Sequence, residues 1–334
     1  MNVQDLMAEI GADSLEPMAG DVSSRQYFRG VRGGKAIIVM MYPDASSVHL
    51  AELRRFISIG NMLAENGLRV PECFAVYEDK GCAVFEDLGQ TPFSACLEDR
   101  PDDWARFYSM ATDVLRGLAE INTPDDLPPF TQSPMHKKRD FAIKYTYPIF
   151  HGTSVSDDAL AEFNAVWDEI EGGLAPCPHG FVHGDFHLEN LMYTADEQCA
   201  LIDFQDASIG PLPYDLVNLL EDARKTVPDD IKAQMIDHYC AGMSGADKGV
   251  FLQWYSVLAA QFHGRVIGLF IMLAAEQGRD AYLVHLPRLV NYMQVNLKQP
   301  VLAPLEAFFI RQGLDFGALN DLDGEEIRKI YSKL

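Results

Sequence analysis

The chain has few basic residues for its size. Its 334 residues include 27 Lys and Arg against 49 Asp and Glu, which gives a formal net charge of −22. Nucleic acids and anionic membrane surfaces bind proteins through clustered Lys and Arg. The composition therefore argues against a nucleic-acid or membrane partner, whereas a cationic small molecule is compatible with it.

A Cys-x-x-Cys pair, a signal-peptide pattern and a long apolar run are also not found in the sequence. The first ten residues include acids and lack the basic-then-apolar pattern of a signal peptide. The most apolar run, residues 266–275, is too short to span a bilayer and predicts a buried helix. Six cysteines without a Cys-x-x-Cys pair are typical of reduced thiols, so we expect a cytoplasmic protein. They are Cys73, Cys82, Cys96, Cys177, Cys199 and Cys240.

The length predicts two lobes, because 334 residues exceed the size at which one hydrophobic core usually keeps growing. Hydrophobic residues make up 48% of the chain, which is enough for a substantial core. Period-two patterns and one helical pattern fill the chain up to about Gly89, and helical patterns dominate beyond it. The sequence therefore predicts an α+β fold with a small β-rich lobe at 1–89 and a larger, mainly helical lobe at 90–334.

Local patterns set the expected elements. Arg32-Gly33-Gly34-Lys35 predicts a tight hairpin turn, and Asn66-Gly67 predicts a helix stop. Ser156 is a candidate helix cap, and the proline-rich stretch 122–134 is expected to be a loop. Strands are predicted at 26–31, 36–42, 73–78 and 82–86. Helices are predicted at 48–65, 103–121, 156–170, 214–225, 231–241, 248–277 and 282–296.

Two short polar stretches carry the chemistry. The first is His183-Gly184-Asp185-Phe186-His187-Leu188-Glu189-Asn190, and the second is Leu201-Ile202-Asp203-Phe204. Each adjoins an apolar run, so the polar residues are expected at strand ends or in a loop between short strands. Phosphoryl transfer from ATP needs a carboxylate to orient the attacking hydroxyl and oxygen ligands to hold Mg²⁺. Asp185 fits the role of the base, and Asn190 and Asp203 fit the roles of the metal ligands.

The order and spacing of these residues resemble the aminoglycoside phosphotransferase and choline-kinase-like family of small-molecule kinases. In protein kinases the corresponding Asp-Phe is followed by glycine, whereas Asp203-Phe204 is followed by Gln205. The small-molecule kinase family that this chain resembles also lacks that glycine. The stretches 23–29, 67–71, 86–89 and 201–220 resemble the branch that phosphorylates the anomeric hydroxyl of N-acetylmuramate and N-acetylglucosamine. The resemblance implies a protein-kinase-like two-lobe fold, ATP and Mg²⁺ as cofactors, and an amino sugar as the acceptor.

The resemblance also indicates the nucleotide side of the site. Ser23 and Ser24 occupy the place of the phosphate-covering loop, and backbone atoms of the linker near Val84–Asp87, which includes Glu86, are expected to meet adenine. The third-strand Lys of kinases is missing, because Val39 or Met40 stands where it is expected. We expect Arg25 or Arg29 to supply that charge.

The remaining candidates belong to the helical lobe. His183 and His187 are expected to brace the catalytic loop by hydrogen bonds, as is Asp215 from the start of a helix. Contacts to the acceptor are expected from the helical lobe, and the oligomeric state is expected to be a monomer or a weak dimer. The candidate acceptor residues are Asp206, Arg224, Trp254, Tyr255, His263 and Arg265.

Three alternatives stay open at this point. The acceptor could be an aminoglycoside, choline or homoserine, because a fold does not carry substrate identity. The chain could be a nucleotide-binding pseudokinase. His183, Asp185, His187 and Asp203 could instead be ligands of a metallohydrolase, since imidazole and carboxylate bind zinc and iron.

Overall fold

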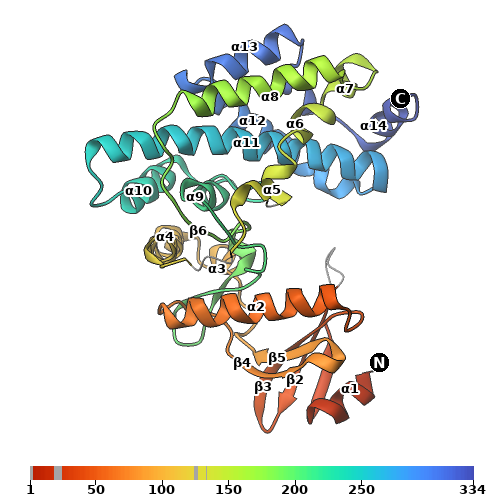
Figure 1. Ribbon diagram of the computed structural model, residues 1–334, viewed down its shortest axis with the longest axis vertical. Helices are drawn as coiled ribbons and strands as arrows, with labels where there is room; N and C mark the ends of the chain where they lie inside the picture. The colour runs from red at the N-terminus through yellow and green to blue at the C-terminus, as the bar shows by residue number, and fades with distance from the viewer. Residues whose placement is uncertain (1–2, 19–24, 124–126, 133) are drawn as a thin grey trace. The chain divides into compact units, whose positions relative to one another are not determined.

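The computed structural model describes residues 3–18, 25–123, 127–132 and 134–334 (Figure 1). The chain forms two compact units. We call residues up to 117 together with 188–207 the N-terminal unit, and residues 118–187 together with 208–334 the helical unit. The lobe boundary expected at residue 89 stays a prediction, because compactness and function need not divide a chain at the same residue.

A five-stranded antiparallel sheet forms the centre of the N-terminal unit, in the order β1-β2-β3-β5-β4. The predicted hairpin joins β2 to β3, with Arg32 paired to Lys35. Gly33 and Gly34 have φ values of 58° and 79°, a region that glycine enters without strain. The strands are β1 (Ser14–Pro17), β2 (Gln26–Arg32), β3 (Lys35–Met41), β4 (Cys73–Tyr77) and β5 (Cys82–Glu86).

The two faces of this sheet have different partners, because successive side chains of a strand point to opposite faces. On one face, Val39 and its alternate neighbours on β3 pack with Leu6 and Ile10 of α1 (Val3–Ile10) in an apolar cluster. On the other face, Ile38 and Met40 line a cavity. The sheet thus separates a closed core from an open face.

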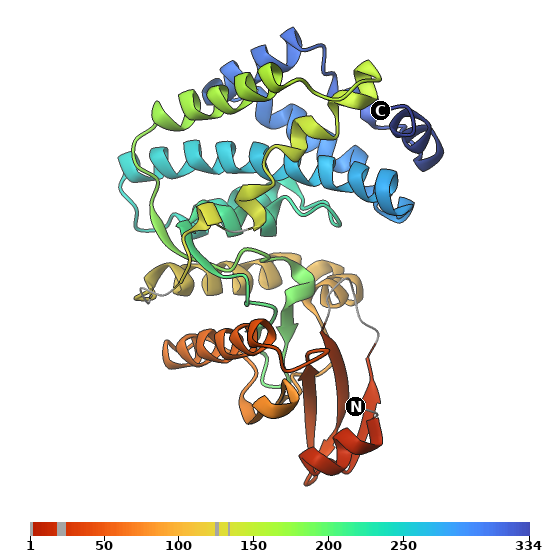
Figure 2. The ribbon, with the colours of Figure 1, turned by 45° about the vertical axis from the view of Figure 1, so that its right-hand side comes forward.

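Helix α2 (Ser47–Glu65) packs on the open face, and Figure 2 shows it running beside the sheet. The Ser46 side chain caps it by accepting a hydrogen bond from the His49 N–H at 3.4 Å. Phe56 contacts Phe85 of β5 edge-on, with ring centroids 5.3 Å apart, and stacks on Phe204 at 4.5 Å. The residue after Asp203 is therefore built into the core of the N-terminal unit.

The rest of the N-terminal unit consists of a hairpin, helices and 3-10 turns outside the sheet. A two-stranded hairpin, β7 (Leu191–Tyr193) with β8 (Cys199–Leu201), follows the 3-10 turn Leu188–Asn190. Helix α4 (Trp104–Glu120) begins in this unit. The remaining elements are the 3-10 turns Glu78–Lys80 and Pro101–Asp103 and helix α3 (Phe93–Asp99).

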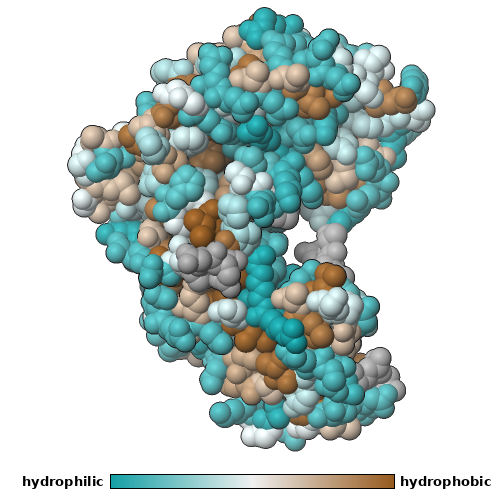
Figure 3. All heavy atoms as spheres, viewed as in Figure 1, coloured by the Kyte–Doolittle hydropathy of each residue, from teal (hydrophilic) through white to brown (hydrophobic). Residues whose placement is uncertain are grey.

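Helix α11 (Gly245–Gln277) runs through the helical unit, with α9 (Pro213–Leu220) on one side and α8 (Asp157–Gly172) on the other (Figures 1 and 2). Its length and apolarity would let it cross a membrane, but 83% of its most apolar window is buried inside the protein. It is the central core helix, and Figure 3 shows the viewed face of this unit as mainly hydrophilic. The other elements are α5 (Pro134–Lys137), α6 (Phe141–Lys144), α7 (Tyr147–His151), α10 (Asp229–Tyr239), α12 (Leu286–Leu297), α13 (Ala303–Arg311), α14 (Gly324–Tyr331), β6 (His179–Val182) paired with β9 (Ser208–Pro211), and the 3-10 turns Phe130–Gln132, Asp280–His285, Pro300–Leu302 and Phe316–Leu319.

Most predicted elements agree with the structure, and some are wrong. The helix predicted at 214–225 ends at Leu220, because Glu221 leaves helical geometry at φ −127° and its carboxylate bonds to residues of other helices. The helix predicted from Tyr282 begins at Leu286, after a 3-10 turn. Several short elements, such as β1, α3 and α13, were not predicted. The expected loop 122–134 contains a 3-10 turn, with 124–126 and 133 outside the described residues.

We expect Phe56→Ala to destabilise the protein by about 3–5 kcal/mol, because it removes a ring that is 7% exposed and contacts two other rings. Val48→Ala on the same helix is the control, since Val48 is 64% exposed and its loss should change the free energy of unfolding by less than about 0.5 kcal/mol. Urea denaturation measures both. Equal effects of the two substitutions would contradict the packing described for α2.

Candidate active site

A cavity of about 510 Å³ opens on the face of the sheet against which Phe56 of α2 packs. All of its lining residues belong to the N-terminal unit. Its sheet side is mainly apolar, with Ile38, Met40 and Phe85. Asn190 and Asp203 line it as well. The cavity thus combines an apolar slot with two oxygen-bearing side chains, an arrangement that suits a ligand with a flat apolar part and an anionic part.

The β7–β8 hairpin explains why Asn190 and Asp203 meet at one cavity. Leu191 is paired with Leu201, so the residues just outside that pair lie at the same end of the hairpin. The Ile202 N–H donates to the Asn190 carbonyl at 3.1 Å and extends the pairing by one step. The two expected metal ligands are therefore brought together by antiparallel register, although twelve residues lie between them.

Asp203 has an unusual backbone and a cationic neighbour. Its φ is 62°, in the left-handed region that few residues other than glycine adopt. A non-glycine residue in this region is a reason to look for a functional role. Arg25 Nη2 lies 3.7 Å from Asp203 Oδ1, and the Arg25 side chain is 12% exposed. Of the two arginines expected near the phosphates, Arg25 is the one paired with a proposed metal ligand.

Arg29 has a different set of partners. It donates to both Asp87 carboxylate oxygens, at 2.8 and 3.0 Å, and to the Gly89 carbonyl at 2.8 Å. Both Arg29 and Asp87 line the cavity. Because a bidentate arginine–carboxylate pair has a fixed geometry, this contact ties β2 to the 86–89 segment.

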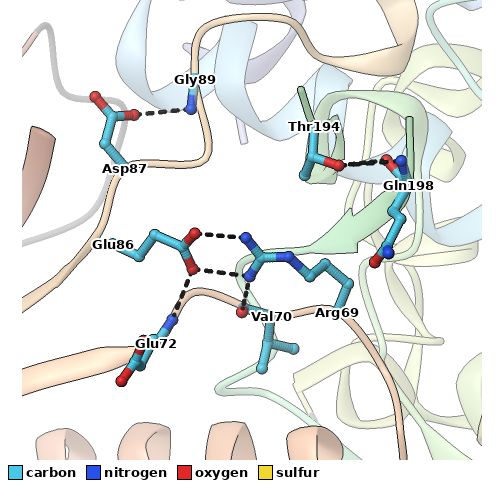
Figure 4. A network of polar contacts seen from close by, with 8 residues as sticks. All are labelled: Arg69, Val70, Glu72, Glu86, Asp87, Gly89, Thr194 and Gln198. Atoms are coloured by element: carbon cyan, nitrogen blue, oxygen red, sulfur yellow. Dashed lines mark hydrogen bonds and ion pairs between the residues drawn. The ribbon is translucent and has the colours of Figure 1, made fainter. Parts of the chain in front are cut away.

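Glu86 is held from the other direction. Arg69 donates to both of its carboxylate oxygens, at 2.8 and 2.5 Å, and the Glu72 N–H donates to Oε2 at 3.3 Å (Figure 4). Figure 4 also shows the Gly89 N–H donating to Asp87 at 2.9 Å. The segment expected to meet adenine is thus fixed by two arginine–carboxylate pairs. The two ion pairs that hold this segment, Arg69 with Glu86 and Arg29 with Asp87, were not predicted, because the partners lie 17 and 58 residues apart in the sequence.

Met40 is the β3 residue that takes the place of the expected Lys. Its side chain faces the cavity and accepts a hydrogen bond from the Tyr27 hydroxyl at Sδ, 3.6 Å away. Val39 is fully buried on the opposite face. Ser23 and Ser24, expected over the phosphates, lie outside the described residues.

The segment 183–187 begins where β6 ends, in the helical unit. Asp215, on the first turn of α9, accepts hydrogen bonds from the backbone N–H groups of His183 at 2.6 Å and of Gly184 at 3.0 Å. The Asp185 N–H donates to His183 Nδ1 at 3.3 Å, so Nδ1 is the acceptor nitrogen of that ring. His187 Nε2 lies 3.4 Å from Asp185 Oδ1. The structure therefore brings together all four predicted residues of this segment and α9.

The Asp185 carboxyl is ionised at neutral pH. Burial acts to raise its pKa, but the hydrogen bond from His187 and the charges of His187, His183 and Arg224 outweigh burial and lower the pKa to about 2. Its side chain is 45% exposed, so a ligand can reach it. A carboxylate of this kind accepts a hydrogen bond from a hydroxyl at any physiological pH.

Asp215 is perturbed in the opposite direction. It is 3% exposed, and burial raises its pKa to about 7, against the two backbone hydrogen bonds, which favour the carboxylate. Two neighbouring carboxyls in one site thus have pKa values shifted to opposite sides.

Two of the acceptor candidates belong to the core. His263 and Tyr255 are 0% and 5% exposed, and both bond to the buried Glu221, at 2.6 and 3.0 Å. Expecting them to contact the acceptor was wrong, because both side chains are buried inside the unit and bonded to Glu221. Trp254 donates to the Ala175 carbonyl at 2.8 Å, and Arg265 is buried beside Tyr214.

Within the described residues, no group of three or more His, Cys, Asp or Glu side chains is arranged to hold a metal ion. Asn190 and Asp203 offer oxygen donors at one cavity, and the Asp203 side chain is 36% exposed. That donor set fits Mg²⁺, which is usually bound by one or two carboxylates together with water and phosphate oxygens.

The family model described as the phosphotransferase enzyme family matches residues 14–248, which is more than half of the chain. The chain belongs to this family. The protein is therefore a phosphotransferase of the kinase type, and the prediction of a kinase is confirmed. The metallohydrolase alternative is not supported.

Named relatives of this phosphotransferase are similar along most of its length. It is 31% identical over 331 residues to the N-acetylmuramate/N-acetylglucosamine kinase of Caulobacter vibrioides, covering 89% of this chain and 91% of that protein. A protein of the same name from Pseudomonas aeruginosa is 25% identical, covering 89% and 88%.

A solved structure of a choline/ethanolamine kinase family protein from Mesorhizobium loti is 16% identical, with a TM-score of 0.60 over 96% of this chain and 99% of that one. The predicted protein-kinase-like fold, with a small sheet-based lobe and a larger helical lobe, is confirmed by this likeness. At this identity the likeness concerns the fold alone.

The pKa of Asp215 gives a prediction for the stability of this phosphotransferase. Between the ordinary carboxyl value of 3.8 and the raised value of about 7, the folded chain binds more protons at Asp215 than the unfolded chain does. The free energy of unfolding should therefore fall as the pH rises through that window, and Asp215→Asn should lack this contribution. Urea denaturation of both proteins at about pH 4 and about pH 8 isolates it. Parallel pH dependences in the two proteins would contradict the raised pKa.

Proposed function

We propose that this phosphotransferase is an ATP- and Mg²⁺-dependent amino-sugar kinase that phosphorylates the anomeric hydroxyl of N-acetylmuramate- and N-acetylglucosamine-type sugars. The observation that carries the proposal is the 31% identity to a relative named for those two sugars, over nearly the full length of both chains. The cavity lined by Asn190 and Asp203 supports a nucleotide-binding role for the N-terminal unit.

Asp185 is the proposed catalytic base. The acceptor oxygen forms a bond to the γ-phosphorus of ATP while the bond from that phosphorus to the bridging oxygen of ADP breaks. The proton of the acceptor hydroxyl passes to Asp185 and then to solvent. Because the pKa of Asp185 is about 2, its main contribution is to orient the hydroxyl by accepting its hydrogen bond, and the proton moves late in the reaction.

Asn190 and Asp203 are the proposed Mg²⁺ ligands. When bound, the ion supplies positive charge that neutralises the phosphate oxygens during transfer. The hairpin register that brings the two side chains to one cavity supports this role. His183, His187 and Asp215 keep their proposed role of positioning the Asp185 loop, which the short contacts among them support.

Arg25 is the proposed substitute for the missing Lys, in preference to Arg29. Arg29 is committed to Asp87 and Gly89 and positions the cavity wall. Arg25 pairs with Asp203 at 3.7 Å, which leaves its guanidinium next to the proposed place of the metal and the phosphates. Glu86 contributes to the nucleotide site through its backbone, since its carboxylate is held by Arg69.

The test of the function is ADP release with Mg-ATP and each of four acceptors: N-acetylmuramate, N-acetylglucosamine, kanamycin and choline. We expect turnover with the two N-acetyl sugars and a sugar 1-phosphate as the product. Asp185→Asn should lower kcat by about 10²- to 10⁴-fold, because general acid–base groups contribute that much. Turnover of kanamycin or choline alone would move the function to another acceptor. ATP binding without any turnover would favour a pseudokinase.

The role of Arg25 has its own test. Arg25→Ala should raise the KM for ATP about tenfold, because a charged hydrogen bond to phosphate contributes enough for that change. In that background Met40→Lys should restore part of the loss, since Met40 faces the cavity that Asp203, the partner of Arg25, also lines. Met40→Lys alone should give no gain. Arg32→Gln is the control, because Arg32 is an arginine of β2, the strand that follows Arg25, and contacts Tyr77 outside the cavity lining. No change of KM in Arg25→Ala would remove the arginine from the phosphate site.

A further inference from the structure

The segment 221–228 joins α9 to α10 in the helical unit and has no assigned role. It begins directly after the helix whose first turn holds the Asp185 loop through Asp215. It contains two carboxylates, Glu221 and Asp222, followed by Arg224. Their burial and partners decide which charge this segment presents to a ligand.

Glu221 is buried and fully occupied. It is 1% exposed and accepts hydrogen bonds from Lys232, Tyr255, His263 and Asn296, which belong to α10, α11 and α12. Burial acts to raise the pKa of its carboxyl, but the hydrogen bonds and charges of His263 and Lys232 hold that pKa below the ordinary value. The carboxylate therefore anchors the start of the segment and does not face a ligand.

Asp222 orients Arg224. Its side chain is 4% exposed, and Asp222 Oδ1 accepts a hydrogen bond from the Arg224 N–H at 2.7 Å and lies 3.6 Å from Arg224 Nη1. Arg288 of α12 holds the chain on both sides of Arg224, by donating to the Ala223 backbone carbonyl at 2.5 Å and to the Thr226 side chain at Oγ1, 2.7 Å away. Arg224 thus stands on a rigid support, which is what a binding group requires.

The Arg224 side chain is 50% exposed, in contrast to the two buried carboxylates before it. Burial acts to raise the pKa of the Asp185 carboxyl, and the charge of Arg224 is one of the contributions that lower it. Burial lowers the pKa of the His285 imidazole, and the charges of Arg288 and Arg224 act in the same direction. Acidic side chains return at Asp229 and Asp230, on the first turn of α10, where the helix dipole favours them. Between its buried carboxylates and α10, the segment therefore presents the cation of Arg224, whose charge acts on Asp185.

We propose that Arg224 is a specificity-determining residue that binds a carboxylate substituent of the acceptor, at a distance from the hydroxyl that is phosphorylated. The proposal rests on the proposed function, since it concerns the acceptor of that reaction. An arginine fork held by a buried aspartate matches a carboxylate in charge and geometry. The same group repels the ammonium groups of a polycationic acceptor, so it selects among acceptors by repulsion as well as attraction.

The two N-acetyl sugars test this role, because N-acetylmuramate carries a carboxylate and N-acetylglucosamine does not. In Arg224→Gln we expect the KM for N-acetylmuramate to rise about tenfold or more, which is the loss of one charge-assisted contact. The KM for N-acetylglucosamine and kcat for both sugars should stay within about twofold, because the contact is made equally in the ground and transition states. Arg224→Lys should recover part of the lost selectivity by keeping the charge.

Lys225→Gln is the matched control, since it removes the neighbouring cation of the same segment and should leave the ratio of the two KM values unchanged. Turnover of N-acetylglucosamine by Arg224→Gln shows that the variant is folded. Equal losses for both sugars, no loss for either, or a selective loss in Lys225→Gln instead would overturn the proposal while leaving the sugar-kinase function intact. Turnover of neither sugar by the unmodified protein would reject the proposed function, and the role of Arg224 with it.

Discussion

The Asp215 carboxylate, which accepts the backbone N–H groups of His183 and Gly184, is the interaction on which the helical part of the site depends. It takes two donors that no strand partner uses at the point where β6 ends, and it does so from the first turn of α9, where a carboxylate is favoured. With the backbone of this segment fixed, Asp185 can bond through its N–H to His183 and through its carboxylate to His187. The exposed carboxylate therefore has a set direction before any substrate arrives, which is the preorganisation that catalysis needs.

The N-terminal unit solves a similar problem by strand pairing instead of a buried charge. Twelve residues separate Asn190 from Asp203 in the sequence. The register of the β7–β8 hairpin, whose strands have three residues each, brings the two side chains to one cavity. Phe204 then locks Asp203 in place by stacking on Phe56, while the neighbouring wall is tied by Arg29 with Asp87 and by Arg69 with Glu86. The polar groups that face the cavity are thus fixed by contacts behind them.

The sequence alone predicted the features that depend on local pattern. Four of the five strands of the sheet follow from strand-like patterns, the Gly33-Gly34 turn from glycine's freedom at positive φ, and the order of Asp185, Asn190 and Asp203 from the spacing of the motif. The predictions that were wrong concern features set by contacts between residues far apart in the sequence. The end of α9 at Leu220 follows from Glu221 bonding to residues up to 75 positions away, and no local pattern signals that. Choosing Met40 over Val39 required the face of the strand, and separating Arg25 from Arg29 required knowing that Asp87 occupies the latter.

The net charge of the whole chain and the charge of one binding segment can have opposite signs. A net charge of −22 describes the whole surface and, read alone, favours a cationic acceptor. In the segment that follows α9, however, the carboxylates of Glu221 and Asp222 are buried and bonded, and the group left half-exposed is the guanidinium of Arg224, whose charge acts on Asp185. An acceptor is recognised at distances of a few ångströms, whereas exposed charges farther away than about 8–10 Å are screened by salt. The local cation therefore has more influence on which small molecule binds than the acidic surface does, and the acidic surface acts mainly on solubility and on long-range encounter.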